Sequence, residues 1–471
     1  MLTHLTATSL LLPLAALGVI AYIQWWWSIL KHWLPISSLR TEYLNETNTS
    51  TAKNEIVMHS TLAPKPIISI PQSIPNQITA STSNSNTEIR GLTTLIPFRN
   101  EALRIQPLLD SLTKIQAPVT WEIIFCDDHS NDNSLEIIKK FIAQHPHLQA
   151  KIIELPEAEN GKKSALSAAI AAAQYEIIHT TDADCRLNPN IYSHLLKCIQ
   201  QPNIEMVLGR VEFTTNFESQ GNNINSDLEI QGDIINSNTE IQGDIINNDL
   251  ENPPEQKGSN QKSHRLLQQY QLIENTALIA LGYSEFLKKN PAAANGANLM
   301  FKKSAFLNLG GYSGNTQYAS GDDVFTLEKF ILHNPNSVAF CTHPQATVVT
   351  DVESDFALFK NQRIRWMKKT FLQKTQKTAL KQTFMGIFLL GFWVMAIEAV
   401  LSGHYESMAL LWLGKLCVDA ACVSLLLRTH PQKPCLPDII LCSILQVFWL
   451  PTLGLLAANK QFSWKGRSHS A

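Results

Sequence analysis

The sequence predicts an α/β domain with a mostly parallel sheet, joined to one N-terminal and about three C-terminal membrane helices. Strand-like and helix-like segments alternate from residue 91 onward, which is typical of a parallel sheet covered by helices. Residues 5–30 carry no charge and are long enough to cross a bilayer. Three further apolar runs lie near the C-terminus, at 382–401, 408–427 and 436–458.

Composition excludes some classes of protein. The formal net charge of −2 over 471 residues gives no sign of a nucleic-acid partner. The eight cysteines include no C-x-x-C pair, which agrees with a reducing compartment and with the absence of structural zinc.

Charges around the first apolar run predict its orientation. No Lys or Arg precedes it, whereas Lys31 and Arg40 follow it, so the soluble domain is expected in the cytoplasm. A cleaved signal peptide is the less favoured alternative, because a basic start is missing and bulky tryptophans (25–27) end the run. We therefore expect an integral protein of a bacterial inner membrane.

These patterns divide the chain into five regions. They are a transmembrane anchor (1–32), a flexible linker (33–90), the soluble domain (91–380), membrane helices (382–458) and a basic tail of cytoplasmic type (459–471). Within the domain, residues 218–262 form a polar insertion in which an 11-residue stretch is duplicated, at 229–239 and 240–250. Two polar copies are too few for a repeat fold, so we expect a disordered surface insertion.

Each element of the sheet has its own signal. Apolar runs predict strands at 92–97, 121–128, 150–155 and 175–182. Helical periodicity or alanine-rich composition predicts helices at 101–115, about 133–144 and 161–173.

Polar side chains follow three of these strands. They are Arg99, Asn100 and Glu101 after the first, Asp127 and Asp128 after the second, and Asp182 and Asp184 after the fourth. Ligands of open α/β sheets bind beyond the carboxyl ends of the strands. The three clusters therefore predict a site along one edge of the sheet.

Two aspartates one residue apart repel each other unless a cation lies between them or one stays protonated. Carboxylate oxygens without nearby Cys or His favour magnesium or manganese over zinc. On its own, however, the D-x-D at Asp182 and Asp184 is more simply a turn, because Asp is common in turns.

The D-x-D is one of several ordered motifs. They are IPFRNEA (96–102), DDHSND (127–132), NGKKSALSAAI (160–170), TDADC (181–185), NGANLMFKKSAFLNLGGY (295–312), SGDDVF (320–325) and QRIRW (362–366). In this order the chain resembles the membrane-bound family 2 glycosyltransferases, the branch that includes cellulose, hyaluronan and ceramide glycosyl transfer enzymes. The resemblance runs from residue 92 to about 370 and implies a Rossmann-like GT-A fold.

The resemblance also implies roles for individual residues. Donor and nucleotide binding would fall to Pro97, Arg99, Asn100, Glu101, Asp128, Lys162 and Asp182. Asp184, with Asp182, would bind Mg²⁺ or Mn²⁺, and Asp323 would be the catalytic base, with Asp322 where the family more often has Glu. The motif Q-x-x-R-W would place Gln362, Arg363, Arg365 and Trp366 at the acceptor and diphosphate.

The expected reaction is inverting transfer from a UDP-sugar to a lipid or glycan acceptor. Two alternatives remain: a processive polysaccharide synthase, for which four membrane segments are few, and a non-catalytic membrane scaffold on a transferase fold. His129 and His179 lie near the motifs but lack ligand spacing, so we do not expect them to be catalytic. Gly161 is interpreted as a turn residue, and the basic segment 356–381 also suits a membrane surface.

The expected topology contains a conflict. Three C-terminal spans would leave the tail outside, whereas Lys460, Lys465 and Arg467 favour the cytoplasm. One segment is therefore expected not to span, and 382–401, which contains Glu398, is the first candidate. Lys415 and Asp419, four residues apart in the second segment, are expected to pair inside the bundle.

Overall fold

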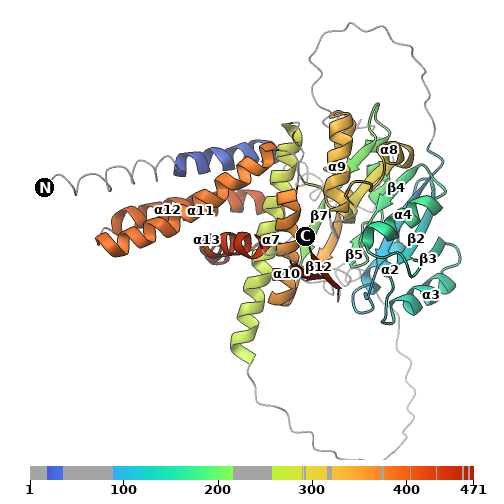
Figure 1. Ribbon diagram of the computed structural model, residues 1–471, viewed down its shortest axis with the longest axis horizontal. Coiled ribbons are helices and arrows are strands. Elements are labelled where there is room, and N and C mark those ends of the chain that lie inside the picture. Colours follow the sequence, from blue (N-terminus) through green and yellow to red (C-terminus); the bar gives the residue numbers. More distant parts are fainter. Residues whose placement is uncertain are drawn as a thin grey trace, which may run out of the picture.

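The computed structural model describes residues 18–34, 89–215, 257–288, 290, 293–315, 321–372, 376–403, 405–430, 432–458, 461–464 and 467–470. In this part of the chain a mixed α/β domain lies beside a group of long apolar helices (Figure 1). Residues 1–17 of the expected anchor, 35–88 of the linker and 218–256 of the insertion fall outside the described residues.

The domain is built on a sheet that has seven strands among the described residues, in the order β3-β2-β1-β4-β8-β6-β9. β1 pairs in parallel with β2 and β4, and β2 with β3, whereas β8 runs antiparallel to β4 and β6. The strands are β1 (Gly91–Phe98), β2 (Thr120–Asp127), β3 (Gln149–Glu154), β4 (Ile177–Thr180), β6 (Met206–Leu208), β8 (Leu299–Lys302) and β9 (Val338–Phe340). The predicted mostly parallel sheet is confirmed.

The first three strands lie within one residue of their predicted bounds. The fourth is shorter than predicted, because β4 ends at Thr180 instead of 182. Asp182 and Asp184 consequently belong to the connection that leads into β5 (Cys185–Leu187). This irregular backbone lets the two side chains point in different directions.

Two of the three predicted helices have the expected bounds, α3 (Ser134–Gln144) and α4 (Lys162–Ala172). The helix predicted at 101–115 is shorter, since α2 spans Gln106–Leu112. The carbonyl of Glu101 accepts from the backbone N–H groups of Arg104 and Ile105, which closes a turn before the helix. This turn leaves Arg104 beside the carboxyl end of β1.

A second, smaller sheet has the order β5-β10-β7, with β7 (Val211–Thr214) and β10 (Val348–Asp351). β5 and β10 are antiparallel, and Cys185 is paired with Thr350. This pairing brings the residues just before Cys185 close to those just after Asp351. Asp184 and Glu353, far apart in the sequence, thus become neighbours.

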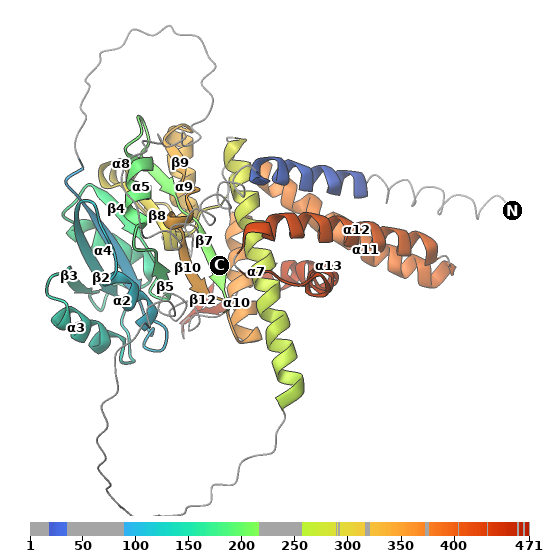
Figure 2. The same ribbon diagram turned by 180° about the vertical axis from the view of Figure 1, so that it is seen from behind.

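Two helices, α7 (Lys257–Leu287) and α10 (Phe356–Leu372), lie between the sheets and the apolar helices (Figures 1 and 2). Residues 257–262, which we assigned to the insertion, form the start of α7. Gln271 on α7 exchanges hydrogen bonds with the backbone of Glu353, which anchors α7 to the segment that leads into α10.

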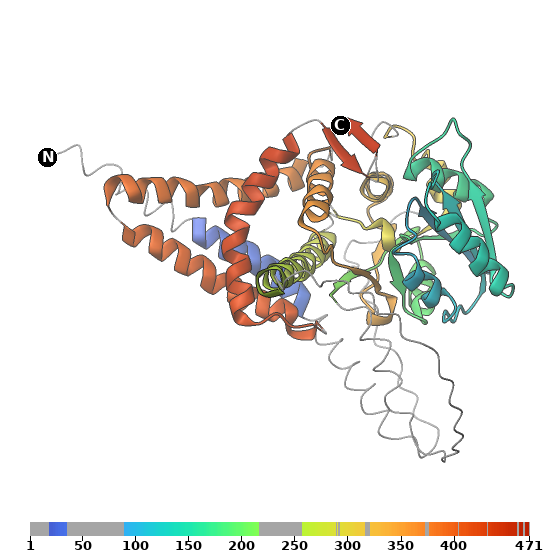
Figure 3. The same cartoon turned by 90° about the horizontal axis from the view of Figure 1, so that it is seen from below.

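The apolar helices are residues 18–34, α11 (Gln376–Ser402), α12 (Tyr405–Leu426) and α13 (Leu436–Ala458). Within the described residues, 408–426 and 436–457 are long and apolar enough to cross a membrane, and 386–402 is a shorter apolar helix. α11 and α12 extend away from the sheets, whereas α13 crosses them at their base and contacts α7 and α10 (Figure 3).

The predicted pairing of Lys415 with Asp419 is confirmed. Both side chains are buried and form an ion pair, and Lys415 also donates to the Ser443 carbonyl of α13 at 3.0 Å. Tyr22 and Trp26 of the N-terminal helix both donate to Asp419. One carboxylate therefore connects the N-terminal helix to α12 and, through Ser443, to α13.

The tail forms a hairpin of β11 (Gln461–Trp464) and β12 (Arg467–Ser470), and β11 contacts α10. This hairpin thus lies on the same side of the apolar helices as the sheets (Figures 1 and 2). α11 and α12 form an antiparallel pair that extends away from the domain. α13 crosses the base of this pair and stays near the domain (Figure 3).

Candidate functional site at the carboxyl edge of the sheet

The loops after β1 and β2 are bound to each other. Arg99 Nη1 donates to the carbonyls of Asp128 and His129, at 2.6 and 2.9 Å. Asn100 has a positive φ of 52° and accepts from the Asn131 backbone through Oδ1. Arg99 and Asn100 therefore hold the β2 loop in shape, and Pro97 lies within β1 opposite Cys126.

Asp128 is the acid that reaches from β2 toward α4. Its buried carboxylate accepts from the backbone N–H of Gly161 at 2.8 Å. Gly161 has φ +94°, a conformation that L side chains rarely adopt, and it is the N-cap of α4. The turn at Gly161 thereby directs Lys162, the first residue of α4, over the edge of the sheet.

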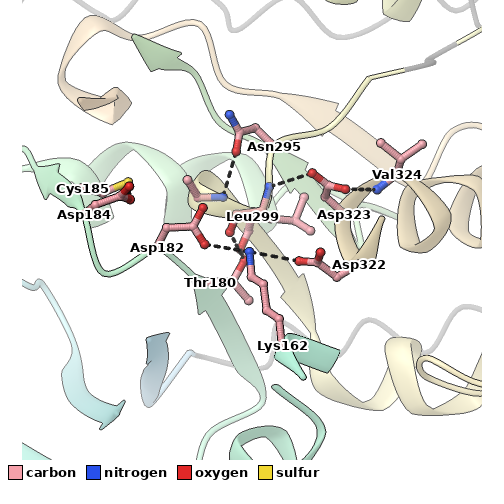
Figure 4. Close-up of polar contacts among 12 residues, drawn as sticks. Lys162, Thr180, Asp182, Asp184, Cys185, Asn295, Leu299, Asp322, Asp323 and Val324 are labelled. Carbon is pink, nitrogen blue, oxygen red and sulfur yellow. Dashed lines mark hydrogen bonds and ion pairs between the residues drawn. The ribbon is translucent and has the colours of Figure 1, made fainter. Parts of the chain in front are cut away.

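Lys162 joins two aspartates from opposite sides of the site. Its Nζ lies 2.7 Å from Asp182 Oδ1 and 3.3 Å from Asp322 Oδ2 (Figure 4). Burial alone would lower the pKa of Lys162, but Asp182 and Asp322 raise it well above its usual value. Burial alone would raise the pKa of Asp322, but Lys162 and Lys369 lower it to about 2. Lys162 and Asp322 are therefore both charged at neutral pH.

Asp323 lies beside Asp322 at the start of α9 (Asp322–His333). Its oxygens accept from the backbone N–H groups of Val324 (2.8 Å) and Gly296 (3.3 Å) (Figure 4). Lys369 Nζ lies 3.1 and 3.2 Å from the two oxygens. Asp323 is buried, and donors from α9, the 296 turn and α10 fix its orientation.

Asp184 does not face Asp182. Its Oδ2 lies 2.8 Å from Arg104 Nη2. Figure 4 shows Asp184 beside Cys185, apart from the contacts of Lys162. The other guanidinium nitrogen, Nη1, lies 3.6 Å from Glu353 Oε1. The two aspartates of the D-x-D thus each have their own cation.

The Q-x-x-R-W segment lies on α10 and contacts α7 and the second sheet. Gln362 donates to Glu353 Oε1 at 3.2 Å, and Arg363 donates to Glu274 at 2.6 Å. Arg363 is buried and lies over the ring of Trp366, which packs beside Phe213. Arg365 lies on the same helix. The structure thus joins Gln362 to Asp184 through Glu353 and Arg104, and places Arg363 and Trp366 in a buried contact.

Sequence reasoning missed three charged residues of this site: Arg104, Glu353 and Lys369. Arg104 falls inside a segment predicted as helix, and Lys369 falls in a basic run interpreted as a membrane surface. Glu101, by contrast, was predicted as a site residue, is buried, and binds Ser134 through its backbone N–H.

The residues of this site fit a divalent metal such as Mg²⁺ or Mn²⁺ whose coordination is completed by phosphate and water. Among the described residues, no group of three or more His, Cys, Asp and Glu is placed to hold a metal by itself. Magnesium commonly uses one or two carboxylates and takes its remaining ligands from phosphate and water. Asp182 and Asp184, with side chains 37% and 25% exposed, are carboxylates of this kind, and in this structure they are paired with Lys162 and Arg104.

Two histidines near the motifs have other surroundings. His129 has a positive φ of 58° and its Nε2 lies 2.7 Å from the Glu159 carbonyl. Burial lowers the pKa of His179 to about 4, and its ring contacts Asn298 and Tyr192. His179 is thus a neutral side chain beneath the sheet edge.

Comparison with known proteins identifies part of this domain. Residues 93–240 match the model of glycosyl transferase family 2. The chain is 30% identical over 123 residues to the poly-beta-1,6-N-acetyl-D-glucosamine synthase of Staphylococcus epidermidis, which is 26% of this chain and 29% of the relative. It is 26% identical over 120 residues to the dodecaprenyl-phosphate galacturonate synthase of Rhizobium johnstonii, which is 25% of this chain and 35% of the relative.

Another relative is the dolichyl-phosphate beta-glucosyltransferase of Trichomonas vaginalis, 31% identical over 23% of this chain and 33% of the relative. The chain thus spans about a third of the length of these relatives. Among solved structures, a mannosyltransferase of Pyrobaculum calidifontis is 16% identical, with a TM-score of 0.48 over 93% of this chain and 99% of that one.

Proposed function

We propose that this chain, whose residues 93–240 match glycosyl transferase family 2, transfers a sugar from a UDP-sugar to a lipid or lipid-linked glycan at a membrane. The observation that carries this proposal is the position of Lys162 between Asp182 and Asp322, beside Asp323. At this sheet edge, Lys162 is a fixed cation, and Asp182 and Asp184 are partly exposed carboxylates that can hold a metal. This combination suits a nucleotide diphosphate. A buried, oriented carboxylate beside them suits a base.

The proposed reaction is a single displacement at the anomeric carbon. Asp323 accepts the proton of the acceptor hydroxyl while the hydroxyl oxygen bonds to the anomeric carbon. The bond from that carbon to the diphosphate oxygen breaks on the opposite face, so the configuration inverts and UDP leaves. Lys162 neutralises charge that develops on the diphosphate.

A divalent metal held by Asp184, with Asp182, would add positive charge at the diphosphate. Asp128 and the loop that Arg99 and Asn100 hold in shape would receive the nucleoside. The proposed acceptor and diphosphate residues are Gln362, Arg363, Arg365 and Trp366. For this role Arg363 would have to leave Glu274, with which it forms an ion pair.

An apolar acceptor is supported by where the candidate base lies. Asp323 contacts Lys369 on α10, and Phe359 of the same helix stacks on Trp449 of α13, at 5.3 Å between ring centroids. α10 thus reaches from the base to an apolar helix. Two relatives carry a dolichyl or dodecaprenyl phosphate in their names, which points to the same class of acceptor.

We further propose that α11 and α12 cross a bacterial inner membrane and that the domain and the tail both face the cytoplasm. The contact of β11 with α10 supports a shared side. In this topology α13, instead of the 382–401 segment that we considered first, lies along the membrane surface. That assignment removes the conflict between the apolar segments and the basic tail.

The test is UDP release by the full chain in detergent, over a panel of UDP-sugars with Mn²⁺ and a membrane lipid extract. We expect turnover of one or a few donors, with transfer to a lipid-extractable product. Asp184→Asn should lose most of this turnover. If the protein neither turns over nor binds any donor, the result favours the alternative of a non-catalytic scaffold.

A further inference from the structure

The guanidinium of Arg104 lies between two carboxylates from distant parts of the chain. Nη2 is 2.8 Å from Asp184 Oδ2, and Nη1 is 3.6 Å from Glu353 Oε1. The first distance is that of a charge-assisted hydrogen bond, and the second is that of a looser ion pair. Arg104 therefore already lies near a second carboxylate to which it can turn.

The pair of Arg104 and Asp184 is open to exchange. The side chain of Arg104 is 40% exposed and that of Asp184 is 25% exposed, and ion pairs at such exposure contribute little to stability. Lys162 differs, since its side chain is only 18% exposed and binds Asp182 and Asp322 together. Of the two D-x-D carboxylates, Asp184 is thus the one that an incoming cation takes more easily.

We infer that Arg104 is an exchangeable counter-cation of Asp184, which neutralises this carboxylate before a divalent metal binds and turns to Glu353 when the metal takes its place. This inference rests on the proposed function, in which Asp184 is a metal ligand. Arg104 is accordingly a positioning residue that acts through Asp184 and Glu353.

The exchange would reach the Q-x-x-R-W segment. Glu353 Oε1 also accepts from Gln362 at 3.2 Å, and Gln362 Oε1 accepts from Arg363. When Arg104 turns fully to Glu353, it competes with Gln362 for the same oxygen. Metal binding at Asp184 is thereby coupled to the hydrogen bonds of Gln362 and Arg363.

The experiment measures the affinity for Mn²⁺ alone, from the free-ion signal in electron paramagnetic resonance, on the full chain in detergent. Arg104→Gln should bind Mn²⁺ about three- to fivefold more tightly, because the metal no longer displaces a guanidinium. Arg90→Gln is the matched control, since Arg90 is exposed at the start of the domain, and it should leave the affinity unchanged.

Glu353→Gln separates the exchange of Arg104 from a simple attraction of Mn²⁺ by the negative charge of Glu353. Without its second partner Arg104 stays on Asp184, so Mn²⁺ should bind about two- to threefold more weakly. In the Arg104→Gln background the same change should have no effect, since Glu353 acts through Arg104. An equal effect in both backgrounds, or unchanged or weaker binding by Arg104→Gln, would overturn the inference and leave the proposed function standing.

Asp184→Asn distinguishes a failure of the proposed Arg104 exchange from a failure of the proposed metal site. We expect it to lose most Mn²⁺ binding. If Asp184→Asn binds Mn²⁺ as the wild type does, or if the wild type binds none, Asp184 is not a metal ligand. In that case the metal assignment of the proposed function fails together with the inference, whereas UDP release in the donor panel judges the transferase activity independently.

Discussion

Lys162 lies 2.7 Å from Asp182 and 3.3 Å from Asp322, and so joins the turn after β4 to the first residue of α9. The three residues come from the fourth strand's connection, the start of α4 and the start of α9. This relationship holds the proposed donor carboxylates and the proposed base in one constellation.

Replacement of Lys162 by Gln should reduce kcat/KM for the donor by about 100-fold, because the fixed cation of the proposed diphosphate site is lost. It also leaves Asp322 without its nearest counter-cation. Steady-state UDP release measures the effect. Lys139→Gln, on the exposed side of α3, is the control and should match the wild type. Equal activity of both variants would show that Lys162 takes no part in donor binding or turnover.

Gly296→Ala tests how tightly the constellation is packed. A Cβ at this position would lie 2.9 Å from Asp322 Oδ2 and 3.3 Å from Lys162 Nζ, so the pair must shift. We expect at least a tenfold loss of kcat, while the melting temperature changes little. Gly282→Ala on α7 meets only an ordinary contact of 3.5 Å with Ala293 and should keep its activity. Full activity of Gly296→Ala would show that the pair need not stay in place.

Stability should fall in mild acid because of one buried histidine, His179, and one half-buried histidine, His343. Burial lowers the pKa of His179 to about 4, and burial with His194 lowers that of His343 to about 4. Both are neutral in the folded domain, whereas the unfolded chain protonates them below about 6.5. Their contribution is complete above pH 6.5 and is lost as the pH falls toward 4, by at most about 1.4 kcal/mol per pH unit for each histidine.

Chemical denaturation between pH 7 and 5 measures this slope. His179→Gln should make the dependence shallower, even if it lowers stability at pH 7. His147→Gln, at an exposed position, should leave the slope unchanged. An unchanged slope in His179→Gln would mean that this ring is already protonated or does not titrate in the unfolded chain.

The buried pair in the apolar bundle should be costly to break. Asp419→Asn leaves Lys415 buried beside Ser443 without its carboxylate, which we expect to cost about 3–5 kcal/mol. It also weakens the contacts of Tyr22 and Trp26 with α12. The midpoint of tryptophan fluorescence unfolding in detergent should fall. The double change Lys415→Met with Asp419→Leu should restore much of the lost stability. If it restores none, the loss in Asp419→Asn does not come from an unpaired Lys415.

The sequence alone carries much of this site. Parallel strands end at the same edge of a sheet, so Asp128 and Asp182 could be placed together from the strand pattern. The neighbouring turn at Gly161 could be anticipated as well. The ordered motifs added Asp323, whose approach to Gly296 depends on contacts between distant segments.

Other features could not be obtained from local pattern. Arg104, Glu353 and Lys369 carry no periodic or motif signal, and they meet their partners only because β5 pairs with β10 and α10 passes α9. Similarly, α13 is as apolar as a spanning helix, and composition does not distinguish crossing a bilayer from lying along it. Tertiary packing brings the three charged residues to their partners, and the contacts of α13 with α7 and α10 support its proposed position along the membrane surface.

We propose that Asp323 is the catalytic base and takes no part in binding UDP. The most direct test compares Asp323→Asn with the wild type for UDP binding by calorimetry and for sugar transfer from the active donor. We predict unchanged UDP affinity and a loss of transfer of about 10²–10⁴-fold. Transfer by Asp323→Asn at the wild-type rate would contradict the account.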